Sequence, residues 1–441
     1  MLTLLYFSWV YSLGAVRPSQ FFSSISSAYS AKNAALENIT DFSASVHPVA
    51  AAVSSAGSTF AAKYSDRELT DIYSRVENKL AEAIGSAKSS ESISSADFNT
   101  VLSGKIIYLE YESSIPLFLI AAWHDVEPAE QMCDIFSDFV ILSADNEQVA
   151  LYCRSQDNEF IKITTAAKSN TLENVFASYS TDNAAFAIFC GDEYRSLRPE
   201  TVILNFEPAV PELTAQSPAI RNNNNEAEFL FSAFKYDTYT VRKYEENDGT
   251  IVYVDNLSTL NITRNGILHF NTPEKQGIEI YDNAQYMPQT DKLKRAVEAS
   301  YSLVAESFRG IDSSAALRLN GVYSEDNSYV VSFVRMIDGI PMYSSDGYST
   351  AYVKIKDNLI LSAYINLRCY HSDGHSVPIL PIKQAIAALS VEDGNICRLG
   401  IYYSDNFNEN VHADWYAREI ASSFQAAVTT EDGAQIEMEQ N

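Results

Sequence analysis

The pattern of apolar and polar positions repeats one arrangement twice, roughly ninety residues apart. In each copy, a stretch of helical period precedes stretches in which apolar and polar residues alternate with period two. The first copy predicts a helix at Asn225–Lys235 and strands at Thr238–Tyr244, Thr250–Asp255, Leu260–Arg264 and Ile267–Asn271. The second predicts a helix at Thr290–Arg309 and strands at Leu317–Tyr323, Tyr329–Ile337, Ser349–Lys356 and Leu359–Leu367. Each copy contains a tight two-residue hairpin, at Asn265-Gly266 and at Asp357-Asn358 respectively.

The second copy also predicts how its parts pack. Ala351, Val353 and Ile355 alternate with more polar residues, which is typical of a sheet with one buried face. The preceding helix carries an apolar stripe, formed by Leu293, Val297, Tyr301, Val304 and Phe308. That stripe is the expected cover for the apolar face of the sheet, and it indicates an α+β fold.

The N-terminal half predicts a separate mixed α/β domain. Its clearest helix is Asp66–Ile84, for which Ser65 and Glu68 form a capping box and Gly85 suits the end. A serine-rich loop, Ser86–Ser95, follows. The further elements are a strand at Lys105–Glu112, a helix at Pro116–Trp123, strands at Phe139–Ser143, Gln148–Arg154 and Glu159–Thr164, a helix at Leu172–Ser180, and strands near Phe186–Cys190 and Thr201–Leu204. Towards the C-terminus we expect a short helix at Pro381–Leu389 and a strand at His412–Ala417 that carries Trp415.

Proline and asparagine mark the boundaries between the predicted domains. The segment Glu207–Asn225 contains three prolines and an asparagine run, which is the composition of a linker. A second boundary lies at Asn283–Gln289. The predicted organisation is an anchor at 1–22, an N-terminal α+β domain at 23–206, a linker at 207–225, a middle helix-plus-sheet domain at 226–287, a C-terminal helix-plus-sheet domain at 288–420 and an acidic tail at 421–441. Within the first domain, Ser23–Ala62 is expected to be a stalk that leads into an edge strand.

The first sixteen residues, Met1–Val16, carry no charged side chain. A membrane span needs about 20 apolar residues, and Phe21, Phe22 and Ile25 extend the apolar character of this segment. We favour a membrane anchor whose first residues are missing, because the basic region of an export signal is absent. A cleaved export signal and a buried N-terminal helix are the alternatives.

Composition narrows the classes of partner. The chain has 441 residues and a formal net charge of −26, which argues against binding to nucleic acid and to anionic lipid. Its five cysteines, Cys133, Cys153, Cys190, Cys369 and Cys397, form no CxxC pair, so neither a zinc site nor a disulfide framework is indicated.

The sequence offers little chemistry. It has no GxGxxG turn, P-loop, HExxH or GxSxG motif. His371, Asp373 and His375 lie close together, but Gly374 and Pro378 predict an exposed loop and no further metal ligand is indicated. His124-Asp125 suggests a base with its orienting group, yet lacks a nucleophile and is better explained as a helix end. The paired acids Glu245-Glu246 fit a solvated hairpin tip. We therefore predict no catalytic, cofactor-binding or metal-binding residue.

Many tyrosines fall in or beside the predicted strands: Tyr239, Tyr244, Tyr253, Tyr329, Tyr343, Tyr348, Tyr352 and Tyr364. Cross-strand packing is the role we predict for them. A stacking platform for a ligand or glycan is the alternative.

Several of these segments resemble a known family. Val252–Ile262, followed by Asn265-Gly266, resembles the middle domain of the YycH regulatory proteins. Phe333–Tyr343, which contains Asp338-Gly-Ile-Pro-Met-Tyr, resembles the DG-I-P-V-Y strand pair of the YycH and YycI C-terminal domains. Tyr64–Trp123 is similar to the first domain of clostridial YycH-like proteins, and Trp415 fits their closing strand.

The resemblance implies a non-enzymatic, single-pass membrane protein with its bulk outside the cell. It implies as partners a sensor histidine kinase of the WalK (YycG) type, which controls cell-wall metabolism, and a YycI-like protein. It brings no catalytic residue, cofactor or metal. A secreted PepSY-like binding or inhibitory module, acting on a protease or the cell wall, is the alternative function, and an enzyme is a third class.

Overall fold

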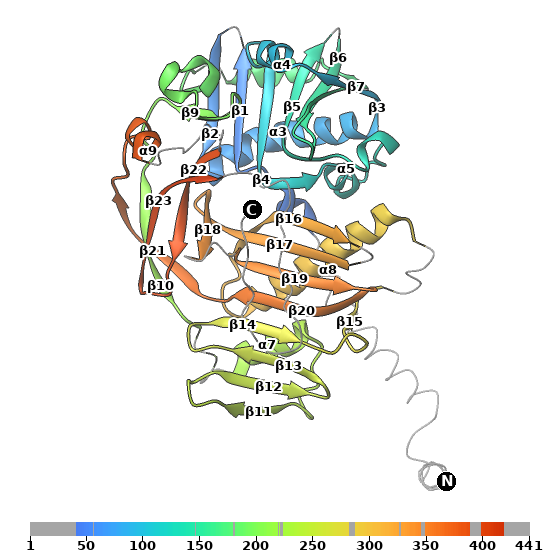
Figure 1. Cartoon of the computed structure of the whole chain (residues 1–441), viewed down its shortest axis with the longest axis vertical. Coiled ribbons are helices and arrows are strands. Elements are labelled where there is room, and N and C mark those ends of the chain that lie inside the picture. The colour runs from blue at the N-terminus through green and yellow to red at the C-terminus, as the bar shows by residue number, and fades with distance from the viewer. Residues whose placement is uncertain are drawn as a thin grey trace, which may run out of the picture. The chain divides into compact units, whose positions relative to one another are not determined.

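The computed structural model describes residues 41–55, 57–145, 147–179, 181–218, 220, 224–281, 287–325, 328–344, 349–388 and 398–418. They form an α+β structure, as the sequence pattern predicts. From Phe42 onward the described residues belong to one compact unit, which contains two large sheets (Figure 1).

The first sheet has seven antiparallel strands in the order β2-β1-β4-β5-β6-β7-β3. These strands are β1 (Ala50–Ser55), β2 (Ser58–Lys63), β3 (Ala87–Ile93), β4 (Ile106–Pro116), β5 (Phe136–Asp145), β6 (Gln148–Arg154) and β7 (Phe160–Lys168). Both faces are buried. The face that carries Ile107 and Leu109 packs in one core with the long helix α3 (Asp66–Gly85), and the face that carries Ile106 and Tyr108 packs in a second core.

Short elements complete the two cores of the first sheet. The first core also contains α5 (Phe118–Trp123) and α6 (Leu172–Ser178). The second contains α4 (Ser95–Leu102) and the two-stranded ribbon of β8 (Ala184–Phe186) and β9 (Val202–Leu204). Four 3₁₀ turns are also present among the described residues: η1 (Phe42–Val46), η2 (Glu130–Met132), η3 (Ala187–Phe189) and η4 (Asp192–Tyr194).

The second sheet confirms the repeated helix-and-meander pattern. The first copy is α7 (Asn224–Ala233) with β11 (Arg242–Glu245), β12 (Ile251–Asp255), β13 (Ser258–Ile262) and β14 (Ile267–Asn271). The second is α8 (Gln289–Arg309) with β16 (Ala316–Glu325), β17 (Ser328–Ile337), β18 (Ile340–Ser344), β19 (Ala351–Lys356) and β20 (Leu359–Asn366). Strand β14 pairs with β20, so the two copies share one sheet, and the short strand β15 (Ile278–Glu279) also pairs with β20.

The predicted stripe of α8 covers this sheet. Leu293, Val297, Val304 and Phe308 are buried in the core that also holds the inward residues of β17, β19 and β20. The half-buried Tyr301 meets Phe333 of β17 edge to face, with ring centroids 5.8 Å apart. The helix α8 therefore packs on the face of the sheet that is predicted from its own 3.6-residue period and the two-residue period of the strands.

The second sheet continues beyond β18 with strands that come from distant parts of the chain. They are β22 (Arg398–Asp405), β23 (Asn410–Arg418), β10 (Val210–Gln216) and β21 (Cys369–Val377), in that order. All pairings in this sheet are antiparallel except that of β18 with β22. The helix α9 (Ile382–Ala388) agrees with the predicted short helix, and β23 carries Trp415 as expected.

Several local predictions are wrong. The segment Ser86–Ser95 is not a loop, because β3 pairs with β7. This edge strand is largely exposed, so its sequence lacks the alternation of apolar and polar residues that would predict a strand. The segment Glu207–Asn225 contains strand β10, so it is not a linker throughout. The capping box is absent, since Ser65 makes no side-chain cap hydrogen bond. Pro116 ends β4, and the helix expected to start there begins at Phe118.

Three further differences concern turns and strand limits. The loop between β13 and β14 spans three residues, because Thr263 and Ile267 still pair and Gly266 adopts φ +86°. The turn at Asp357-Asn358 is a two-residue hairpin, as predicted, and both residues adopt positive φ. Strand β11 begins only at Arg242, and the segment expected to be a stalk already contains β1 and most of β2. The predicted domain boundaries stay a prediction.

The anchor predicted at residues 1–22, the remainder of the stalk before residue 41 and the acidic tail lie outside the described residues. Within the described ranges, no helix combines the length and apolar character needed to cross a bilayer.

Candidate functional site

The histidines that drew attention in the sequence lie on a strand. His371 and His375 belong to β21, not to a loop, because β21 pairs with β10 and accommodates Gly374 at φ +81° in an irregular stretch. On the neighbouring strands, His412 Nδ1 lies 4.0 Å from Glu212 Oε1. Among the described residues, no group of three or more His, Cys, Asp or Glu side chains is arranged to hold a metal ion.

The other sequence candidates are scattered. His124 follows the last turn of α5, where its backbone N–H donates to Ala121, and Asp125 adopts φ +56°. Glu245 and Glu246 lie at the exposed end of β11. The structure therefore brings none of these residues together.

The tyrosines divide into two groups. Tyr253 and Tyr329 are buried, and Tyr352 stacks on its cross-strand neighbour Tyr364 with centroids 5.2 Å apart. In contrast, Tyr239 and Tyr244 are 95% and 51% exposed. Tyr348 lies outside the described residues.

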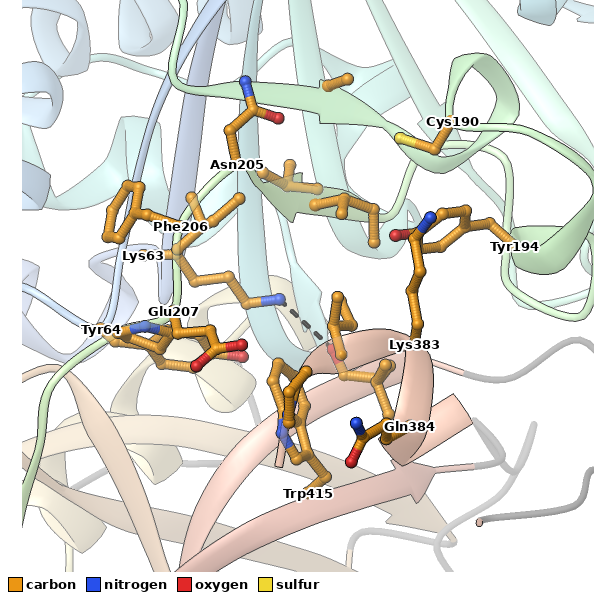
Figure 2. A pocket seen from close by; sticks show the side chains of 18 of the residues that line it. Lys63, Tyr64, Cys190, Tyr194, Asn205, Phe206, Glu207, Lys383, Gln384 and Trp415 are labelled. Atoms are coloured by element: carbon orange, nitrogen blue, oxygen red, sulfur yellow. Dashed lines mark hydrogen bonds between the residues drawn. The ribbon is translucent and has the colours of Figure 1, made fainter. Parts of the chain in front are cut away.

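The described residues form a groove of about 890 Å³ (Figure 2). Its wall is assembled from the end of β2, the β8–β9 ribbon with η3 and η4, the segment after β9, the start of α9, and strands β22 and β23. The labelled side chains around it are Lys63, Tyr64, Cys190, Tyr194, Asn205, Phe206, Glu207, Lys383, Gln384 and Trp415.

The polar side chains of the groove are held by defined contacts. Lys63 Nζ donates to the carbonyl of Leu399, 3.3 Å away, and this bond crosses from the first sheet to β22 (Figure 2). Trp415 Nε1 donates to the carbonyl of Leu380 at 2.7 Å, which fixes the indole beside the start of α9. Lys383 pairs with Glu193 at 2.7 Å, and this contact raises the pKa of Lys383 and lowers that of Glu193.

The groove also carries exposed apolar surface. Phe189 and Phe206 line it and are each 53% exposed. Ile188 and Leu380 are exposed next to lining residues. Burial raises the pKa of the Cys190 thiol, so it stays protonated at neutral pH and is a poor nucleophile. The groove therefore suits a partner with apolar side chains better than it suits covalent chemistry.

Next to the groove a buried ion cluster joins the two sheets. Arg398 Nε of β22 lies 2.5 Å from Glu110 Oε1 of β4, and its Nη1 donates to the carbonyl of Glu112 at 2.6 Å. Tyr343 donates to the Glu112 carboxylate at 2.7 Å. Burial alone would lower the pKa of Arg398, but the charges of Glu110 and Glu112 outweigh it and raise that pKa well above its usual value.

The backbones of the two sheets also touch close to this cluster. A Cβ added to Gly339, in the β17–β18 turn, would lie 2.7 Å from the backbone nitrogen of Ser65. Nearby, the Ile401 N–H donates to the Tyr64 hydroxyl at 3.0 Å, and burial raises the pKa of Tyr64. The groove therefore lies beside a closely packed junction between the sheets.

Sequence reasoning missed this groove. Its residues range from Lys63 to Trp415 and share no motif. A lone lysine at a strand end or a phenylalanine after a short strand carries no local signal.

The described part of the chain thus defines an α+β protein whose main candidate site is a groove between two sheets rather than a set of reacting groups. No family model and no curated protein matches the sequence. Among solved structures, YycH from Bacillus subtilis matches with a TM-score of 0.55 and 14% sequence identity, over 86% of this chain and 94% of that chain. The chain has a YycH-like fold, as its resemblance to that family predicts.

Proposed function

We propose that this chain regulates a membrane sensor histidine kinase of the WalK (YycG) type by protein–protein contact, without catalysing a reaction. The observation that carries the proposal is the YycH-like fold, which extends over 86% of the chain. The predicted anchor at residues 1–22 would tether the protein to the membrane, with its bulk extracytoplasmic.

The groove is the surface that we propose for the kinase contact. Phe189 and Phe206 are large, exposed side chains that line a hollow of about 890 Å³. Interfaces gain most of their binding free energy from a few aromatic or apolar anchors that enter such hollows. Lys63 adds a cationic donor to which a partner carboxylate or carbonyl can bind.

Co-purification from membranes tests the proposal. The full-length chain is tagged, extracted in mild detergent and analysed for bound histidine kinases, and it is compared with a Phe189→Ser, Phe206→Ser double variant. We expect the kinase with the wild type and at least about tenfold less with the double variant, which corresponds to ~1.4 kcal/mol or more.

The matched control is Leu257→Ser, which removes an apolar side chain of similar exposure, 59%, from the β12–β13 turn. It should retain the kinase. If no sample yields a histidine kinase, the proposed function is wrong. If the double variant binds as much kinase as the wild type, the function stands and the groove is not its contact surface.

A further inference from the structure

The outer edge of β11 is one end of the second sheet. In the strand order, β11 is terminal and pairs only with β12 among the described strands (Figure 1). All four of its residues, Arg242, Lys243, Tyr244 and Glu245, are exposed. Edge strands of this kind offer backbone groups to which another strand can pair.

The hydrogen-bonding pattern shows which backbone groups face outward. The Glu246 N–H donates to the carbonyl of Thr250 at 2.8 Å, so Glu246 and Thr250 form a hydrogen-bonded pair. Such pairs alternate along an antiparallel ladder, and the β11–β12 register has no irregularity. Tyr244 therefore directs its N–H and C=O towards β12, whereas Lys243 and Glu245 direct theirs away from β12.

The charged residues on this edge can pair with the same residues of a second copy of the chain. In an antiparallel pair of two identical strands related by a two-fold axis, each residue faces one on the same side of the sheet. If Tyr244 lies at the axis, Lys243 faces Glu245 of the second copy, and Arg242 faces Glu246 of the second copy. Both contacts occur twice. Moving the axis to Lys243 or to Glu245 instead places like charges opposite each other, which destabilises the pairing.

We propose that two copies of this chain associate through their β11 edges, antiparallel, with Tyr244 at the two-fold axis. In this register the outward-facing Lys243 and Glu245 form hydrogen-bonded pairs with their counterparts, and the two Tyr244 residues form the close, non-hydrogen-bonded pair between them. The interaction extends the second sheet across both copies. It does not depend on the proposed kinase contact, since β11 contributes nothing to the groove.

A charge-reversal series on the full-length chain tests the proposal. Sedimentation in non-ionic detergent, at about 0.15 M salt and up to about 100 µM protein, measures the dimer dissociation constant. We expect Lys243→Glu, and separately Glu245→Lys, to weaken the dimer at least about tenfold, because each creates two like-charge contacts. The double variant Lys243→Glu, Glu245→Lys exchanges the charges and should restore the wild-type constant. A monomeric wild type, or single variants that dimerise unchanged, would overturn the proposal.

A cross-link checks the register. The Cα atoms of a non-hydrogen-bonded pair lie about 4.5 Å apart, within the range that a disulfide spans. Tyr244→Cys should form a covalent dimer under mild oxidation. The control Leu257→Cys, on the β12–β13 turn, and the wild type with its own cysteines should not. Absence of the Tyr244→Cys dimer, or equal cross-linking of the control, contradicts the Tyr244-centred register.

Discussion

The two helix-and-meander units share a sequence pattern and one sheet, yet they differ in what surrounds them. The middle unit, formed by α7 and β11–β14, joins its neighbour in the strand order through β14 and ends on the exposed β11. In the C-terminal unit, formed by α8 and β16–β20, strand β17 pairs with β16, β18 and β19, and β18 leads on to β22. The same pattern thus produces an outer unit and an inner one.

The two units also differ in the charge around them. Next to the C-terminal unit, Arg368 Nε lies 3.0 Å from Asp405 Oδ2 with both side chains almost fully buried, and Arg398 of β22 meets Glu110 and Glu112 of the first sheet. In the outer unit, Arg242 and Lys243 are exposed. Removing one member of a buried ion pair strongly destabilises the fold. Exposed charges contribute little to stability and leave a surface available for contacts.

The largest expected effect comes from breaking the junction at Arg398. The variant Arg398→Ala leaves two carboxylates buried without their cation, so we expect it to lower the free energy of unfolding by about 3–5 kcal/mol. The control Arg264→Ala removes an exposed arginine from the β13–β14 turn of the outer unit and should change it by less than about 0.5 kcal/mol. Urea unfolding followed by far-UV circular dichroism measures both.

Neutralising the cluster sharpens that test. The triple variant Arg398→Met, Glu110→Gln, Glu112→Gln removes all of its charges and should recover most of the stability that Arg398→Ala loses. Equal losses in Arg398→Ala and Arg264→Ala would show that the buried cluster does not distinguish the surroundings of the inner unit from the outer unit.

Substitutions in the two hairpins should change the stability by smaller amounts than Arg398→Ala. Gly266 adopts φ +86°, and a Cβ there would lie 2.7 Å from Cδ of Pro218, so Gly266→Ala should destabilise the protein by about 1–3 kcal/mol. Asp357 in the inner hairpin already tolerates φ +48°, and Asp357→Gly should stay within about 0.5 kcal/mol of the wild type. Thermal unfolding measures both, and a Gly266→Ala variant as stable as the wild type would contradict the steric argument.

The sequence predicted these units well because their signals are local. Alternation around Asp357-Asn358 and the stripe of α8 both depend on residues within one or two turns of each other. It missed β10 and β21 because Pro211 and Gly374 interrupt them. Both are strands through pairing with distant segments: β21 pairs with β10, and β10 lies between β21 and β23. For Asn265-Gly266 the sequence predicts the correct hairpin but a loop that is one residue too short. The loop length depends on the backbone pairing of Thr263 with Ile267.

The groove was beyond local reasoning for a physical reason. Lys63 contacts Leu399, and Trp415 contacts Leu380, because the junction of two sheets brings these segments together. The composition of each segment alone fits an ordinary strand end or loop. By contrast, the edge of β11 consists of four consecutive residues. Its pattern of charges can therefore be read directly from the sequence once the strand order is known.

The smallest expected effect is a pH dependence at the seam between the units. His269 of β14 faces Tyr364 of β20, with ring centroids 5.4 Å apart, and burial lowers the pKa of His269. A lowered pKa in the folded state contributes stability above the unfolded value of about 6.5 that is lost as the pH falls through the folded value. From pH 7 towards pH 5 we therefore expect the wild type to lose more thermal stability than His269→Gln, in which the other histidines are unchanged. Parallel pH profiles of the two proteins would mean that His269 does not couple proton binding to the seam, and that the outer unit is held to the inner one without a titrating contact.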